Sequence, residues 1–206
     1  MQKPKPIVIA VILVSFIFSF ISLTFAAEKE TKPLKFGLVY STSGALGFLG
    51  NNVITGHKMA IDEITKAGGF QGRQVELFLR DDAGSPELTT RYMKELILRE
   101  GVDWILTGTG SAISLAAAAV AKEFKVPTFI MGGGTEKVTV EEWNPYIFRY
   151  RPTSGTEART AAKVLAEEVI KDIKDPKIYW ITWDYEYGRS VHEPFISKIK
   201  PSGNSS

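Results

Sequence analysis

The chain has 206 residues, of which 44% are hydrophobic and 11% aromatic, and its formal net charge is +2. This composition supports a folded core and argues against wholesale disorder. Because the sequence contains no cysteine, it excludes a disulfide framework, a thiolate zinc site and a cysteine nucleophile. No block of Lys and Arg stands out, so the sequence gives no support for nucleic-acid binding.

The amino-terminal segment differs in composition from the rest. Two lysines precede an uncharged, mostly apolar run from Ile7 to Phe25, and small residues follow before the charged stretch EKETK. This pattern predicts a signal peptide over residues 1–26 and a linker over residues 27–34. The run has 19 residues, which is close to the length of a spanning helix, so an uncleaved anchor is the alternative. With no cysteine to carry a lipid, we expect a periplasmic protein that is not lipid-anchored.

Residues 35–131 alternate between strand-like and helix-like patterns. Strands are expected at 35–40, 73–80, 104–106 and 126–131. Helices are expected from Val53 to Gly68, from Ser85 to Gly101 and from Ala112 to Phe124. Ser85 is typical of an N-cap, Pro86 of a first helical turn and Gly101 of a helix end. The alternation predicts an α/β fold in which a parallel sheet carries helices on both faces.

The pattern changes after Glu141. The stretch EEWNPYIFRYRPTSG has two prolines, four aromatic residues and no helical period, so we expect an extended crossing segment. Beyond it we expect a helix capped by Thr153 and Ser154, a buried strand over 177–183 and a final helix over 191–199. One strand and two helices are too few to close a core of their own.

Four loops follow the predicted strands at their carboxyl ends, where ligands of open α/β sheets bind. Their sequences are STSGALGFLGN, DDAGSPE, TGTGSA and MGGGTEK. All four are rich in glycine and small or polar side chains, a composition that lets the backbone approach a ligand closely.

Nucleotide binding and catalysis find little support. The loop TGTGSA has Ile113 where a dinucleotide fingerprint needs its third glycine, and no Walker A sequence occurs. His57 and His192 are isolated, and we interpret both as solvent-exposed helix residues. Asp81 and Asp82 are interpreted as turn and helix caps rather than as an acid–base pair. We therefore expect no enzyme, no catalytic residue, no metal and no cofactor.

Two neighbouring loops instead favour a carboxylate site. A helix N-terminus offers free N–H groups and a partial positive charge, and Ser111 adds a hydroxyl at such a position. The next loop supplies three glycines, Gly132 to Gly134, and then Thr135. Each feature also has a simpler explanation, a plain N-cap for Ser111 and a flexible turn for the glycines. Their occurrence on the same sheet edge favours binding.

The ordered combination of these segments resembles a known family. KFGLVYSTSGALGFLG, TGHKMAIDEITKAGG, GRQVELFLRDDAGSPE and LTGTGSAISLAAAAVAKEFKVPTF are similar to the type I periplasmic binding proteins, in particular the leucine/isoleucine/valine-type substrate-binding proteins of ABC importers. The similarity runs from Lys35 to Ile199. It implies a Venus flytrap of two α/β lobes: a first lobe over 35–145, a hinge crossing over 146–152, and the start of a second lobe over 153–206.

The resemblance also implies the site residues. Ser111 and Ala112 match a helix start that takes the ligand carboxylate, and Tyr187 matches an aromatic residue laid over the ligand. The remaining matches are Gly132, Gly133, Gly134 and Thr135 in the next loop, and Phe48 as a stand-in for an aromatic residue of the first loop. The implied partners are an amino acid or related small carboxylate and an ABC permease in the membrane.

Two further expectations concern the class and the length of the chain. A ligand-sensing domain of a receptor or regulator on the same fold is the alternative function, whereas an exported hydrolase lacks a convincing nucleophile–base pair. Family members are far longer and return from the second lobe to finish the first. We therefore expect a truncated chain whose second lobe is incomplete and exposes strand edges and apolar helix faces.

Overall fold

The computed structural model describes residues 32–199. The predicted signal peptide lies outside the described residues, as does most of the predicted linker. Between residues 32 and 199, no helix combines the length and the apolar character that crossing a membrane requires.

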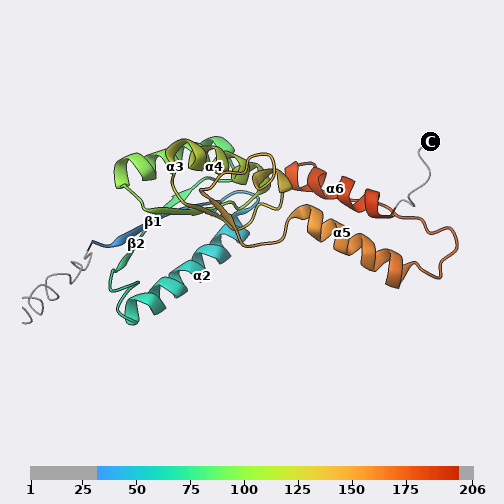
Figure 1. Cartoon of the computed structure of the whole chain (residues 1–206), viewed down its shortest axis with the longest axis horizontal. Helices are drawn as coiled ribbons and strands as arrows, with labels where there is room; N and C mark the ends of the chain where they lie inside the picture. Colours follow the sequence, from blue (N-terminus) through green and yellow to red (C-terminus); the bar gives the residue numbers. More distant parts are fainter. Residues whose placement is uncertain (1–31, 200–206) are drawn as a thin grey trace, which may run out of the picture.

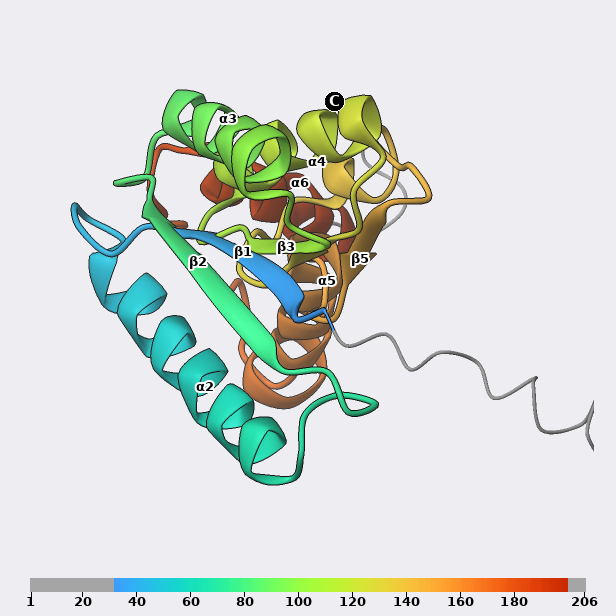
Figure 2. The ribbon, with the colours of Figure 1, turned by 90° about the vertical axis from the view of Figure 1, so that its left-hand side faces the viewer.

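A five-stranded parallel sheet forms the centre of the molecule (Figure 2). Its strands are β1 (Leu34–Tyr40), β2 (Val75–Asp81), β3 (Trp104–Thr107), β4 (Thr128–Ile130) and β5 (Ile147–Arg149). The spatial order is β2-β1-β3-β4-β5. Because the strands are all parallel, the loops that follow them gather at one edge, as the sequence predicts.

Helices cover both faces of the sheet, which confirms the predicted α/β class (Figure 1). One face carries α2 (Gly47–Lys66); the other carries α3 (Pro86–Glu95), its π-helical extension η1 (Leu96–Glu100), and α4 (Ser111–Phe124). Alternate residues of β1 serve the two cores: Leu38 and Tyr40 pack with Ile54 of α2, whereas Val39 packs under α3 and α4. This is the period of two that a strand buried on both faces requires.

The predicted helix boundaries are confirmed where a cap defines them. The Ser85 side chain accepts a hydrogen bond from the Leu88 N–H at 3.2 Å, and Gly101 ends the helix in a left-handed conformation with φ 64°. The start of α2 was predicted six residues too late, at Val53 rather than Gly47. The glycines there allow a close crossing: a Cβ on Gly50 would overlap the Ser41 backbone.

Two helices lie side by side and run in the same direction away from the sheet (Figure 1). The helix α5 (Ser154–Val164) continues into η3 (Leu165–Val169) and packs against α6 (Glu186–Ile199) through a small apolar cluster. Thr153 caps α5 as predicted, because its hydroxyl accepts from the Thr156 N–H at 3.1 Å. Strand β5 lies within the segment expected to cross between lobes, and it pairs with β4.

The buried strand predicted over residues 177–183 is wrong. The structure assigns no strand there, and Tyr179 and Ile181 are 86% and 94% exposed. Only Trp180 turns inward, onto Phe195 of α6 at a ring distance of 4.8 Å. A strand needs a neighbouring strand for its backbone hydrogen bonds, and none lies beside this segment within residues 32–199. The final helix also begins earlier than predicted, at Glu186 rather than Val191.

Candidate ligand-binding site

Asp82 ties the first two loops of the sheet edge together. It is completely buried and accepts hydrogen bonds from the Ser41 hydroxyl at 2.6 Å, the Thr89 hydroxyl at 2.9 Å and the Gly84 N–H at 3.0 Å. Its two carboxylate oxygens are therefore committed to three donors of the protein. Asp82 has a structural role, in agreement with the interpretation of the Asp81–Asp82 pair as caps.

Asp81 organises the same loops from the outside. One of its oxygens accepts from the backbone N–H groups of Thr42 and Ala83, both at 2.9 Å, and of Ser43 at 3.4 Å. Desolvation acts to raise the pKa of this carboxyl. The hydrogen bonds from Ala83, Ser43 and Thr42 outweigh it and hold the pKa well below its ordinary value.

This depressed pKa predicts a measurable acid sensitivity. The contribution of Asp81 to folding is complete above the unfolded-state pKa of about 4 and is lost as the pH falls below it. Asp81→Asn keeps the acceptor oxygen but removes the titration. We expect its unfolding free energy, measured by urea denaturation, to fall less between pH 5 and pH 3 than that of the wild type. An equal fall in both proteins would contradict the assignment.

Ser111 is not the N-cap of α4, so the plainer explanation of this residue does not hold. Gly110 occupies the cap position, and Ser111 is the first helical residue, with only 1% of its surface exposed. Its hydroxyl accepts a hydrogen bond from the Thr135 N–H at 3.2 Å, which joins the two loops expected to form the site. Thr135 is also buried, and its hydroxyl donates to Glu186 of α6 at 3.2 Å. Ala112 is exposed beside Ser111.

The three glycines of the MGGGTE loop are needed for close approach rather than for flexibility. A Cβ on Gly132 would overlap the Gly108 carbonyl, and one on Gly133 would overlap Ser114. A Cβ on Gly134 would lie 2.7 Å from the Tyr187 ring. The aromatic residue that sequence reasoning placed over the ligand therefore already packs on the glycine loop.

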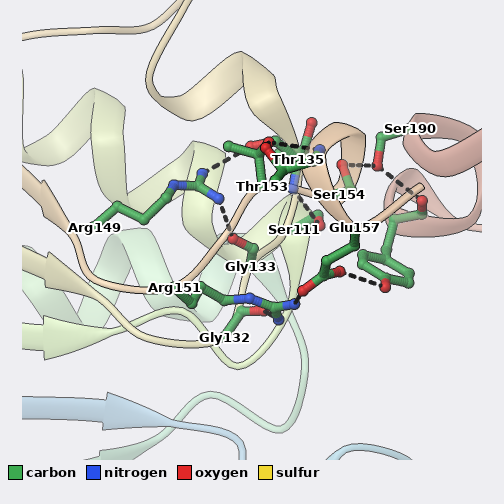
Figure 3. Close-up of polar contacts among 12 residues, drawn as sticks. Ser111, Gly132, Gly133, Thr135, Arg149, Arg151, Thr153, Ser154, Glu157 and Ser190 are labelled. Carbon is green, nitrogen blue, oxygen red and sulfur yellow. Dashed lines mark hydrogen bonds and ion pairs between the residues drawn. The ribbon is translucent and has the colours of Figure 1, made fainter. Parts of the chain in front are cut away.

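Two arginines donate hydrogen bonds to the backbone carbonyls of this loop (Figure 3). Arg149 of β5 donates to the carbonyl of Gly133 at 2.8 Å and to that of Thr135 at 2.7 Å. Arg151 donates to the carbonyl of Gly132 at 2.6 Å and forms an ion pair with Glu157 of α5. Burial lowers the pKa of Arg149, and the neighbouring charge of Arg151 adds to this effect. Neither arginine was singled out in the sequence, because only the tertiary structure brings them to the loop.

Tyr187 of α6 is the last member of the group of side chains around the glycine loop. Its hydroxyl donates to the second oxygen of Glu157 at 2.9 Å, and its ring lies 6.1 Å from that of Tyr185. Burial raises the pKa of Tyr187, and the hydrogen bond to Glu157 raises it further. The structure thus brings Ser111, Gly134, Thr135 and Tyr187 together at the sheet edge.

An open cavity of about 360 Å³ lies between the first two loops and the segment before α6. Its walls are small and aliphatic on one side and aromatic or acidic on the other: Ala45, Leu46, Ala83, Gly84, Trp183, Asp184 and Tyr185. A volume of this order suits a small molecule. Phe48 does not line it; the side chain is 62% exposed at the start of α2, and Leu46 takes that place in the wall.

The two histidines lie outside this site. His57 is half-buried rather than solvent-exposed, because its ring packs edge-on against Tyr40 at 5.7 Å, and this burial lowers its pKa. His192 is exposed on α6, as expected. Over residues 32–199, no three His, Asp or Glu side chains gather in a way that could hold a metal ion.

The fold is a parallel α/β lobe with an open cavity at the carboxyl edge of its sheet. The model of the periplasmic binding protein family matches residues 33–204. The chain belongs to this family, whose members are extracytoplasmic solute-binding proteins.

Three known proteins show the similarity in detail. The Leu/Ile/Val-binding protein homolog 8 of Brucella abortus (strain 2308) is 36% identical over 162 residues, which are 77% of this chain and 40% of that relative. A solute-binding protein of an ABC transporter from Rhodopseudomonas palustris BisB5, solved with 3,4-dihydroxybenzoic acid, matches with a TM-score of 0.71 and 30% identity over 81% of this chain and 44% of that one.

A second R. palustris solute-binding protein, solved with 4-hydroxybenzoate, matches with a TM-score of 0.67 and 28% identity over 81% of this chain and 43% of its own. The chain thus spans less than half the length of these relatives.

Proposed function

We propose that this chain is a solute-binding protein of an ABC importer, which holds a small carboxylate between its first lobe and the helices that follow. The observation that carries the proposal is the meeting of Ser111, Gly134, Thr135 and Tyr187 at the sheet edge. The ring of Tyr187 lies 6.1 Å from that of Tyr185, which lines the cavity of about 360 Å³. Backbone N–H groups at the start of α4 and a hydroxyl-rich neighbouring loop suit a negatively charged ligand.

We propose that the protein works by closing its lobes around the ligand, without catalysing a reaction. Residues 35–145 form the first lobe, 146–152 the crossing and 153–206 the start of a second lobe, which closes on the ligand and presents it to a membrane permease. The predicted signal peptide would deliver the protein to the periplasm without a lipid anchor.

The ligand class has two candidates. A branched-chain amino acid is supported by the naming of the Brucella relative as a Leu/Ile/Val-binding protein homologue. An aromatic carboxylate is supported by the bound ligands of the two R. palustris proteins. It is also supported by the row of Trp183, Tyr185 and Tyr187, whose successive ring distances are 6.0 and 6.1 Å. Such a row offers a stacking surface to a planar ligand.

A thermal-shift and calorimetric screen with isoleucine, leucine, benzoate and 4-hydroxybenzoate tests the function. We expect one class of carboxylate to bind, and Ser111→Ala to weaken that binding about tenfold or more, because the buried Thr135 N–H loses its acceptor. Tyr187→Ala is expected to weaken binding similarly. Ser197→Ala, which changes an exposed serine of α6, is the matched control. Equal affinity in all four proteins would exclude the proposed site.

A further inference from the structure

The carboxylate of Glu157 lies between two donors from different elements. Arg151, in the segment between β5 and α5, donates to one oxygen, and the Tyr187 hydroxyl of α6 donates to the other at 2.9 Å. A guanidinium and a phenol that converge on the two oxygens of one carboxylate form a typical carboxylate-binding arrangement. Figure 3 shows Arg151 and Glu157 beside the glycine loop.

These donors lie beside the ligand cavity. The ring of Tyr187 continues the aromatic row of Trp183 and Tyr185, and the latter two line the cavity. Arg151 is held close to Tyr187, because both donate to the same Glu157 carboxylate. The side chains of Arg151 and Glu157 retain 28% and 33% of their exposure, which leaves room for exchange with a solute.

Two other polar side chains of the site bond to the backbone of the glycine loop. Ser111 accepts from Thr135, and Arg149 spans two carbonyls of the loop. Arg151 also donates to the Gly132 carbonyl, but its second terminal nitrogen is paired with a side chain in the first turn of α5, that of Glu157. A carboxylate released from Arg151 would remain near the helix N-terminus, where the macrodipole favours negative charge. Its release therefore costs less than breaking a buried pair would.

We propose that Arg151 and Tyr187 donate to the ligand carboxylate in addition to the groups at the start of α4, and that Glu157 occupies these two donors as an internal substitute until a ligand displaces it. The inference rests on the proposed function, and it assigns the side chains of the same site that bind the charged group of the ligand. It makes Glu157 a competitor, so that ligand affinity is lowered by the fraction of molecules in which Glu157 holds the donors.

The test compares a carboxylate with its neutral amide: phenylacetate with phenylacetamide, and L-valine with L-valinamide, titrated calorimetrically into the full chain. Glu157→Gln removes the competing charge, and we expect it to bind the carboxylates about fivefold or more tightly than the wild type does. Arg151→Ala is expected to lower the carboxylate-to-amide affinity ratio at least tenfold. The matched controls are Glu168→Gln and Arg99→Ala, which change exposed side chains and should leave both ratios unchanged.

A purely structural role for Glu157 predicts the opposite sign, because its loss would loosen Tyr187 and weaken all binding. Carboxylate affinity that is unchanged or reduced in a folded Glu157→Gln protein overturns the inference and leaves the proposed function standing. Carboxylate binding by Glu157→Gln where the wild type binds none supports it. Failure of both proteins to bind any of the four compounds or the carboxylates of the wider screen overturns the inference and the proposed function together.

Discussion

Replacing Asp82 with alanine is expected to lower the free energy of unfolding by about 2–4 kcal/mol. The substitution leaves the fully buried Ser41 hydroxyl without its acceptor, which costs about 1–3 kcal/mol, and it also removes the acceptor of the Gly84 N–H at a part-buried position. Thr89 is affected less, because its hydroxyl also donates to the Ser85 carbonyl at 3.0 Å. For a chain of this size the midpoint of thermal unfolding should fall by roughly 5–15 °C.

Asp82→Asn is the matched control for this experiment. Its amide oxygen can accept from Ser41 and Gly84 as the carboxylate does, while its NH₂ group can donate to the Thr89 hydroxyl, which then donates to Ser85. We expect the asparagine variant to lose about 1 kcal/mol. Urea denaturation of both variants measures the difference. Equal destabilisation by Ala and Asn would mean that the charge of Asp82, rather than its geometry as an acceptor, holds the loops.

The fold of the first lobe could be predicted because each element carries its own local signal. The serine cap before Pro86 and the stop at Gly101 act within one turn of a helix, so the chain alone specifies them. The segment 177–183 has the same apolar composition as a buried strand. A strand, however, forms only where a neighbouring strand pairs with it and side chains pack against it. Because no strand lies beside it within the described residues, this segment does not form a strand despite its apolar composition.

The candidate site could be predicted in outline only. Ser111 and the three glycines stand out in the sequence, because a hydroxyl at a helix start and consecutive glycines are rare local patterns. Arg149, Arg151 and Glu157 carry no such pattern, and they reach the glycine loop only through the path of the chain between β5 and α5. Leu46 was overlooked in favour of Phe48 because an aromatic residue was expected, whereas the helical start of α2 at Gly47 directs Phe48 to the surface.

Gly134→Ala is expected to disconnect the glycine loop from α6. The new Cβ would lie 2.7 and 2.8 Å from two ring carbons of Tyr187, so the ring must move and its hydrogen bond to Glu157 must lengthen. Overpacking of this kind costs about 1–3 kcal/mol of stability. Because Tyr187 lies at the proposed site, the affinity for any carboxylate found in the screen should fall at least tenfold. Near-ultraviolet circular dichroism, which reports on aromatic packing, should change as well.

Two further variants make the steric explanation testable without a ligand. In a Tyr187→Ala background the clash is absent, so Gly134→Ala should then cost almost nothing, and the double-mutant cycle should give a coupling of about 1–3 kcal/mol. Gly56→Ala, in the exposed part of α2 where a Cβ meets nothing within 4 Å, should instead stabilise the protein by about 1 kcal/mol. A cost of Gly134→Ala that persists without the Tyr187 ring would place the constraint in the loop backbone. Tyr187 would then lose its assigned role as the contact between α6 and the glycine loop.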